Sequence, residues 1–319
     1  MKKTTSAILL LFFLILTLSI TILSINGIET NKFNNFISKK INQANSNINI
    51  ELSTIKFKLD IKEISLYLET VNPKISYRGA TVPTKNVKVY IDFISLIKSE
   101  AKIKKINLLL KQLDVDELKK ISTSLKPSNF KSFINNKIQQ GKINTEIDFY
   151  LNENNSLDNF IARGSVSNLK VTVKGNINLD KTNFSFFADK SDVLIKNIFS
   201  ELGPFKIKDG DLKLKLSSEV SIESNFKSYL KYNSKFMNYQ NLIKNFNYAK
   251  NITNLEADLN NTFKISFDKT YKIKEYDYNI NGKILKTNLN FEKPLDNFLL
   301  EKKIDNISLI NSEIKTNFN

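Results

Sequence analysis

Apolar residues recur at every second position along most of this chain, and no other feature of the sequence restricts its fold as strongly. The run that begins at Ile48 keeps to even positions, whereas the run from Ile55 to Ile61 keeps to odd positions. Since successive side chains of a β-strand point to opposite faces, each change of parity predicts a turn or a bulge. The runs are short and lack the regular alternation with helices that parallel sheets require. The sequence therefore predicts a mainly β protein with an antiparallel sheet that has one apolar and one polar face.

Two stretches depart from this period and predict helix. Residues 28–45 carry apolar residues at a spacing of four, which indicates a short amphipathic helix. A helical insert is predicted over residues 116–124 and 127–140, with Asp116 as its first cap and Gly141 at its end.

The segment from Phe205 to Leu216 is the clearest candidate hairpin. Its apolar residues change parity across Lys208–Asp211, a stretch that contains Gly210 and has the composition of a turn. Residues 224–250 are less regular than the rest, and their pattern allows helix.

The N-terminus predicts a transmembrane helix. Residues 7–25 carry no charge, and at about 1.5 Å per residue a helix of this length spans roughly 28 Å, close to the thickness of a bilayer core. Lys2 and Lys3 precede the segment, so the positive-inside rule puts the chain after Asn26 on the non-cytoplasmic side. The alternative is a cleaved signal peptide, although residues 24–27 offer no small-residue cleavage site.

The sequence contains neither cysteine nor histidine, which removes the side chains on which most catalytic and metal sites depend. Disulfides, thiolate and imidazole metal ligands, nucleophile–histidine pairs and lipoprotein processing are all excluded. Asp114, Asp116 and Glu117 lie close together, but acids at the start of a helix are typical of a solvated N-terminus. We therefore expect no enzyme activity, no catalytic residue, no metal site and no cofactor.

The formal net charge of +16 comes almost entirely from lysine, because Arg78 and Arg163 are the two arginines of the chain. The lysines are spread along the sequence, as on an ordinary solvated surface. Near an anionic membrane, each lysine close to the surface would add about 1 kcal/mol of attraction. Nucleic acid is not an expected partner, since the basic residues form no cluster and arginine is nearly missing.

The order of features in the first 120 residues resembles the AsmA-like family of Gram-negative bacteria, which includes TamB and YhdP. An N-terminal anchor and a short helix precede IELSTIKFKLDIKEISLYLE and then VPTKNVKVYIDFISLIKSEAKIKKINLLLKQLDVDEL. The later segments GSVSNLKVTVKG and IKDGDLKLKLSS are similar to the repeating strands of that family. The resemblance implies an elongated, curved antiparallel sheet that forms an apolar groove and conducts phospholipids between the inner and outer membranes. The chain is short for such a role and would need either a partner or a further C-terminal part beyond Asn319 to bridge the periplasm.

These observations divide the chain into an anchor at residues 1–27, an AsmA-like β region at 28–125, and a helical insert with further β repeats at 126–319. We expect a single-pass protein of the inner membrane, with its bulk in the periplasm, that transfers phospholipid or maintains the envelope. The alternative is a structural or assembly factor that binds another envelope protein, for example at an exposed sheet edge.

The apolar positions of the AsmA-like β region are the candidate lining of the groove. They are Phe57, Leu59, Ile61, Leu66, Leu68, Val87, Val89, Ile91, Leu108 and Leu110. Period two looks the same in a closed core, in a lipid-holding groove and on the wall of a membrane barrel. The anchor and the helical insert disfavour the barrel, and the choice between core and groove stays open.

Overall fold

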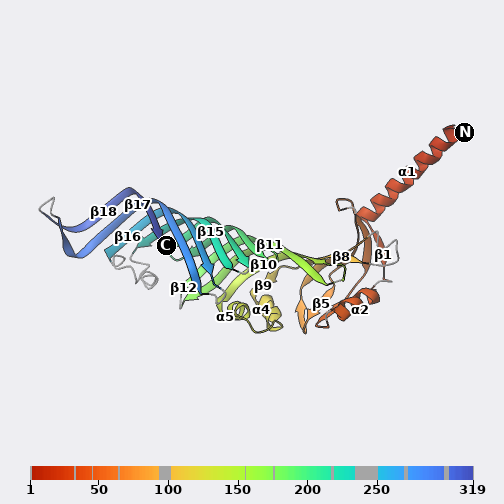
Figure 1. Ribbon diagram of the computed structural model, residues 1–319, viewed down its shortest axis with the longest axis horizontal. Helices are drawn as coiled ribbons and strands as arrows, with labels where there is room; N and C mark the ends of the chain where they lie inside the picture. The colour runs from red at the N-terminus through yellow and green to blue at the C-terminus, as the bar shows by residue number, and fades with distance from the viewer. Residues whose placement is uncertain are drawn as a thin grey trace. The chain divides into compact units, whose positions relative to one another are not determined.

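A computed structural model describes the chain over residues 2–31, 34–44, 46–63, 65–92, 102–154, 156–174, 177–216, 219–233, 251–268, 272–297 and 302–318. Within these ranges the protein is mainly β, as Figure 1 shows. The helices are α1 (Lys2–Ile25), α2 (Asn34–Ala44), α4 (Val115–Thr123) and α5 (Asn129–Lys137).

Fifteen of the strands belong to one large sheet. They are β1 (Ile28–Thr30), β3 (Ile55–Asp60), β4 (Ser65–Val71), β7 (Thr84–Ile91), β8 (Ile103–Leu110), β9 (Leu113–Asp114), β10 (Ile138–Leu151), β11 (Leu157–Lys174), β12 (Ile177–Ala188), β13 (Asp192–Leu202), β14 (Phe205–Leu216), β15 (Val220–Asn233), β16 (Ile252–Phe267), β17 (Ile273–Asn297) and β18 (Lys302–Phe318). A second sheet holds β2 (Ile48–Glu51), β5 (Lys74–Tyr77) and β6 (Ala80–Val82).

The large sheet is antiparallel and open. Its order is β1-β3-β4-β7-β8 and then β10 to β18 in chain order, with β9 paired to β10 off this path. The predicted architecture, an antiparallel sheet with an N-terminal helix and a short helical insert, is confirmed. The short helix predicted at 28–45 is α2, and the three residues of β1 precede it.

The helical insert is present, but its boundaries differ from those predicted. Asp114, not Asp116, caps α4: its Oδ1 accepts a hydrogen bond from the Glu117 backbone amide at 2.9 Å. The Glu117 carboxylate accepts one in return from the Asp114 amide at 3.1 Å, which completes a capping box. Ser128 caps α5, which ends at Lys137, and Gly141 lies within β10 instead of ending the helix.

The predicted hairpin turn at 208–211 is wrong, because β14 runs through it without a break. A register shift opposite β15, between Ile207 and Asp209, absorbs the change of parity. Gly210 is buried, and a Cβ atom at this position would lie 2.7 Å from the Cβ of Phe226 on β15. Residues 224–233 belong to β15 and are not helical, and the remainder of the predicted 224–250 segment, up to 250, lies outside the described residues.

The described chain forms two compact units. The first contains Met1–Pro127 and Asn144–Ala162, and the second contains Ser128–Ile143 and Arg163–Asn319. The first division thus falls two residues after the predicted boundary at 125, and the chain returns once to the first unit.

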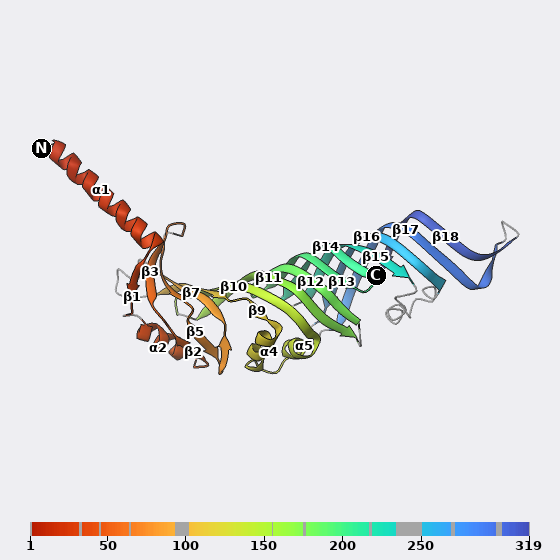
Figure 2. The same ribbon diagram turned by 180° about the vertical axis from the view of Figure 1, so that it is seen from behind.

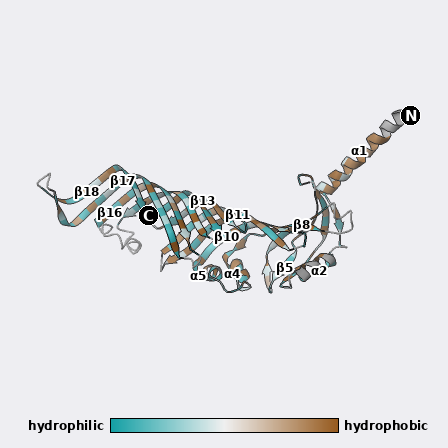
Figure 3. Cartoon of the chain, viewed as in Figure 1, coloured by the Kyte–Doolittle hydropathy of each residue, from teal (hydrophilic) through white to brown (hydrophobic). Residues whose placement is uncertain are grey.

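The N-terminal helix is joined to the first unit without a linker. Its segment Ile8–Ile25 is long and apolar enough to cross a membrane, and none of this segment is buried. Figure 3 shows the apolar colouring of the helix. The amides of Asn26 and Gly27 both donate to the Ile22 carbonyl, at 3.0 and 2.9 Å. Gly27 has a φ of 72°, and α1 contacts β3 directly. The helix therefore ends in a defined turn against the sheet.

Gly27 is expected to be less replaceable than Gly79, although both have positive φ. A Cβ at Gly27 would lie 2.9 Å from the Phe57 carbonyl oxygen, whereas nothing lies within 4 Å of one at Gly79. Gly79→Ala should lower the free energy of unfolding by about 1–2 kcal/mol, the cost of a left-handed backbone at alanine. Gly27→Ala should lower it by about 1–3 kcal/mol more, because the added Cβ is also overpacked. Urea unfolding of the full chain in detergent measures both, and equal losses would contradict the close contact.

Candidate functional site

Strand register places nine of the ten candidate lining residues on one face of the sheet in the first unit. Leu68 of β4 pairs with Phe57 of β3 on one side and with Val89 of β7 on the other. Val87 pairs with Leu108 of β8. Directly paired residues share a face, as do alternate residues of a strand. The face contains Phe57, Leu59, Leu66, Leu68, Val87, Val89, Ile91, Leu108 and Leu110.

Ile61 is the exception. β3 ends at Asp60, and Ile61 lies in the turn that follows, where 60% of the residue is exposed. The Asp60 side chain accepts hydrogen bonds from the amides of Lys62 and Glu63, which is why the strand stops here. Ile61 therefore does not line this face.

Helix α2 and the small sheet cover part of this face. Ile37 of α2 packs against Leu68, Val87 and Val89, all of which are buried. Two hydrogen bonds hold the helix in place: Ser38 Oγ donates to the Ile50 carbonyl at 3.1 Å, and the Asn34 side chain donates to the Ser53 carbonyl at 3.0 Å. The remaining members of this cluster are Ile55 and Ile91, with Ile41, Leu52, Phe57, Ile75, Ile103, Ile106 and Leu108 packed around them.

The space left between α2 and this face is small. The cavity lined by Ile37, Ile55, Leu68 and Val87 has a volume of about 20 Å³, scarcely more than the roughly 10–15 Å³ that one water molecule needs. It cannot admit an acyl chain. At these positions the face is a closed core, which favours the core over the groove for four of the candidates, Leu68, Val87, Val89 and Ile91.

The opposite face of the same strands carries a network of aromatic and charged side chains. The rings of Tyr67 and Tyr90 lie 5.2 Å apart, and Lys105 Nζ lies 4.1 Å from the Tyr90 ring centre. Burial raises the pKa of Tyr90. Burial also opposes ionisation of Glu69, but hydrogen bonds from Lys58 and Asn86 outweigh it and hold the pKa of Glu69 below its usual value. The ion pair, the hydrogen bond and the ring contacts hold these side chains against one another, so the network is a structural feature.

The second unit has a sheet whose two faces differ sharply. Ile265 of β16 lies between Ile222 of β15 and Tyr276 of β17, so a row of apolar side chains crosses three strands. The preceding residue, Lys264, lies between Glu223 and Asp277 on the other face. Apolar and polar colours alternate along these strands in Figure 3.

Apolar side chains on this face are partly exposed. Leu216, Tyr276, Leu309 and Phe318 have exposed fractions between 36% and 50%. None of them is among the ten candidates, which were drawn from the region that resembles the AsmA-like family. The signal that could have found this face is the alternation in 205–216, whose change of parity instead predicts a hairpin.

A buried polar cluster interrupts the apolar face. Asn261 is fully buried, donates to Ser228 Oγ at 2.8 Å and accepts from the Tyr278 hydroxyl at 2.9 Å. Burial raises the pKa of Tyr278. Thr182 and Ser200 form a second hydroxyl pair at 2.6 Å. These groups satisfy one another, as buried polar groups must.

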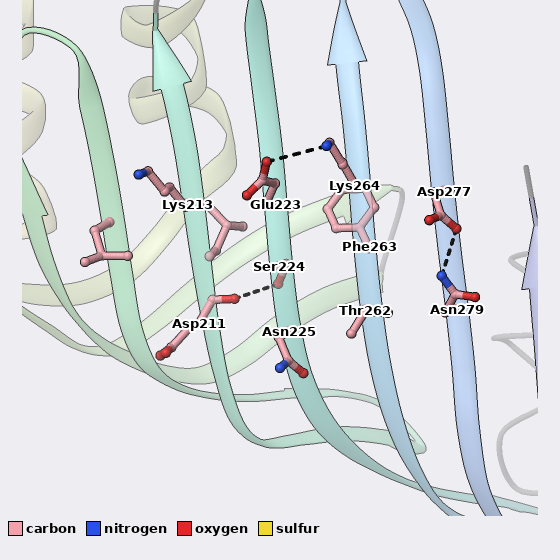
Figure 4. Close-up of a pocket in the computed structure, with 12 residues that line it drawn as sticks. Asp211, Lys213, Glu223, Ser224, Asn225, Thr262, Phe263, Lys264, Asp277 and Asn279 are labelled. Carbon is pink, nitrogen blue, oxygen red and sulfur yellow. Dashed lines mark hydrogen bonds and ion pairs between the residues drawn. The ribbon is translucent and has the colours of Figure 1, made fainter.

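A shallow depression of about 430 Å³ lies on the charged side of strands β14–β17, as Figure 4 shows. Its side chains pair locally: Lys264 lies 3.9 Å from Glu223, and the Asn279 amide donates to Asp277 at 2.8 Å. Among the described residues, no group of three or more acids is placed to hold a metal ion. The depression has the character of a solvated surface.

Comparison of the chain with protein-family models, with curated proteins and with solved structures finds no match. The resemblance to the AsmA-like family therefore stays a prediction from the sequence.

Leu68 and Val71 lie on the same strand and test how far the first unit is closed. Leu68 is 5% exposed and packs under α2, whereas Val71 is 50% exposed. Leu68→Ala should destabilise the protein by about 2–5 kcal/mol, and Val71→Ala should change stability by no more than about 0.5 kcal/mol. Denaturant unfolding measures both. A small loss for Leu68→Ala would mean that this face is open.

Asn261 and Asn260 provide a matched pair in the second unit. Asn261→Ala would leave Ser228 and Tyr278 without their partner, at an expected cost of about 1–3 kcal/mol for each buried group left unpaired. Asn260 is exposed, and its side chain donates to the Asn281 side chain at 3.2 Å, so Asn260→Ala should change stability by less than about 0.5 kcal/mol. Equal effects in thermal unfolding would show that the cluster is not a stabilising contact.

Proposed function

We propose that α1 anchors this protein in the inner membrane of a Gram-negative envelope, and that its bulk lies in the periplasm. We further propose that the protein shields phospholipid acyl chains during their transfer or during maintenance of the envelope. Support for the anchor comes from the length and apolar composition of Ile8–Ile25 and from the preceding lysines, Lys2 and Lys3.

The apolar face of the second unit is the observation that carries the lipid proposal. It crosses β14–β17 in register, and several of its large side chains are partly exposed. Each acyl CH₂ group buried against such a face contributes about 0.8 kcal/mol, and no catalytic group is required. The lining proposed here is therefore this face, since part of the apolar face of the first unit is a closed core.

The dimensions of the face are suitable for this ligand. β16 has 16 residues, which at about 3.3 Å per residue extend over roughly 50 Å. One leaflet contributes about half of the roughly 30 Å bilayer core, so a strand of this length exceeds the length of an acyl chain severalfold.

Neighbouring positions on β16 allow a matched test of the lipid proposal. Ile265 points to the apolar face and Thr262 to the polar face. Ile265→Asp should reduce the phospholipid that co-purifies with the full chain several-fold, because a carboxylate is costly to bury against acyl chains. Thr262→Asp should leave it unchanged. Native mass spectrometry with lipid extraction measures occupancy, and circular dichroism verifies the fold.

A folded wild-type protein that carries no phospholipid would contradict this function. It would favour the alternative, a scaffold for another envelope protein, which one observation supports. β18 stands at the end of the strand order, where a strand of a partner can be added by backbone hydrogen bonds. A stable protein partner in place of lipid is the outcome expected from that alternative.

A further inference from the structure

Three exposed isoleucines lie where α1 meets the first unit. Ile25 ends the helix, Ile28 begins β1, and Ile61 occupies the β3–β4 turn. They are 68%, 57% and 60% exposed. Ile61 is more than thirty residues from Ile25 and Ile28 in the sequence, so strand pairing and not local sequence brings it to this end of the unit.

The strand directions bring Ile61 to the membrane side of the unit. β1 runs away from α1, and β3 pairs with it antiparallel, Ile28 with Phe57 and Thr30 with Ile55. β3 therefore runs back toward the helix. Figure 2 shows β1 and β3 at the base of α1. Ile61 lies four residues beyond Phe57, about 13 Å at most along an extended chain.

The turn that carries Ile61 has a fixed shape. The Asp60 carboxylate accepts from the backbone amides of Lys62 and Glu63, at 3.0 and 3.2 Å. The Glu63 carboxylate in turn pairs with Lys105 of β8 at 2.8 Å. Asp60 and Glu63 thus both have partners, and hydrogen bonds shape the backbone of residues 60–63 around Ile61.

The length of α1 brings this turn within reach of the membrane surface. The 18 residues of Ile8–Ile25 extend over about 27 Å as a helix, which nearly fills a bilayer core of about 30 Å and places Ile25 at its boundary. The headgroup layer beyond it is roughly 5–8 Å thick. Gly27 already contacts β3, with an ideal Cβ 2.9 Å from the Phe57 carbonyl oxygen.

We propose that the β3–β4 turn is a second, shallow membrane contact, in which Ile61 enters the headgroup layer of the membrane that α1 crosses. This inference rests on the membrane anchoring proposed above. The occupant is the lipid surface itself, because the turn is continuous with the end of the membrane helix. The contact fixes the depth of the first unit, which a helix anchor alone does not.

The chain contains no cysteine, so a fluorophore attached to a single introduced cysteine reports the environment of that position alone. Leu14→Cys, Ile61→Cys and Val71→Cys would each carry a fluorophore, in the full chain reconstituted into phosphatidylethanolamine–phosphatidylglycerol vesicles. Val71 is the matched control, because it is an exposed apolar residue at the far end of β4, about 20 Å along the strand from the turn. Two spin-labelled lipids serve as quenchers, one with the spin label at headgroup depth and one with the label at the bilayer centre.

We expect headgroup-depth quenching at position 61 to exceed that at position 71 at least twofold, and deep quenching at position 14. Equal quenching at 61 and 71, with deep quenching at 14, would overturn the contact and leave the anchor intact. Lack of quenching at 14 would overturn both the anchor and the contact. Lipid occupancy of the second unit is measured separately by native mass spectrometry, so failure of the lipid proposal is distinguishable from either result.

Discussion

Cross-strand register is the constraint on which the rest of this structure depends. A slip of one residue would move every side chain of a strand to the opposite face and would break the apolar row through Ile222 and Ile265. Where the sequence changes parity, the sheet absorbs the change locally, as between Ile207 and Asp209. The bulge keeps Leu212 and Leu214 on the same face as the residues before it.

Buried polar groups restrict the same register further. Asn261 meets Ser228 on one neighbouring strand and Tyr278 on the other, at 2.8 and 2.9 Å. A slip would separate these partners and leave at least two buried polar groups unpaired, at about 1–3 kcal/mol each. On a long, partly exposed apolar face, where many registers bury similar apolar area, such a penalty distinguishes one pairing from the others. We infer that the cluster serves specificity of pairing.

The sequence predicted the strands well because their period is a local property of the chain. It failed where a residue serves a distant contact, and where a side-chain hydrogen bond to a nearby backbone amide decides the end of an element. Asp209-Gly210-Asp211 has the composition of a turn, yet Gly210 is required because its strand approaches Phe226 closely. Asp114 and Asp116 both suit a helix start, so the sequence does not distinguish them as caps of α4; the reciprocal hydrogen bonds of Asp114 and Glu117 do. Ile61 continued the odd positions of β3, but the Asp60 side chain ends the strand before it.

The candidate site could not be predicted to the same degree, because alternation records which residues are apolar and not what lies over them. Val87 and Ile37 are fifty positions apart in the chain, and their contact is what turns part of the first unit into a closed core. The same alternation in β14–β17 leaves several large side chains partly exposed. Gly27 provides a further constraint that the alternation does not express. Since it connects α1 to β1 and lies directly against β3, the direction of the helix is tied to that of the first strands of the sheet.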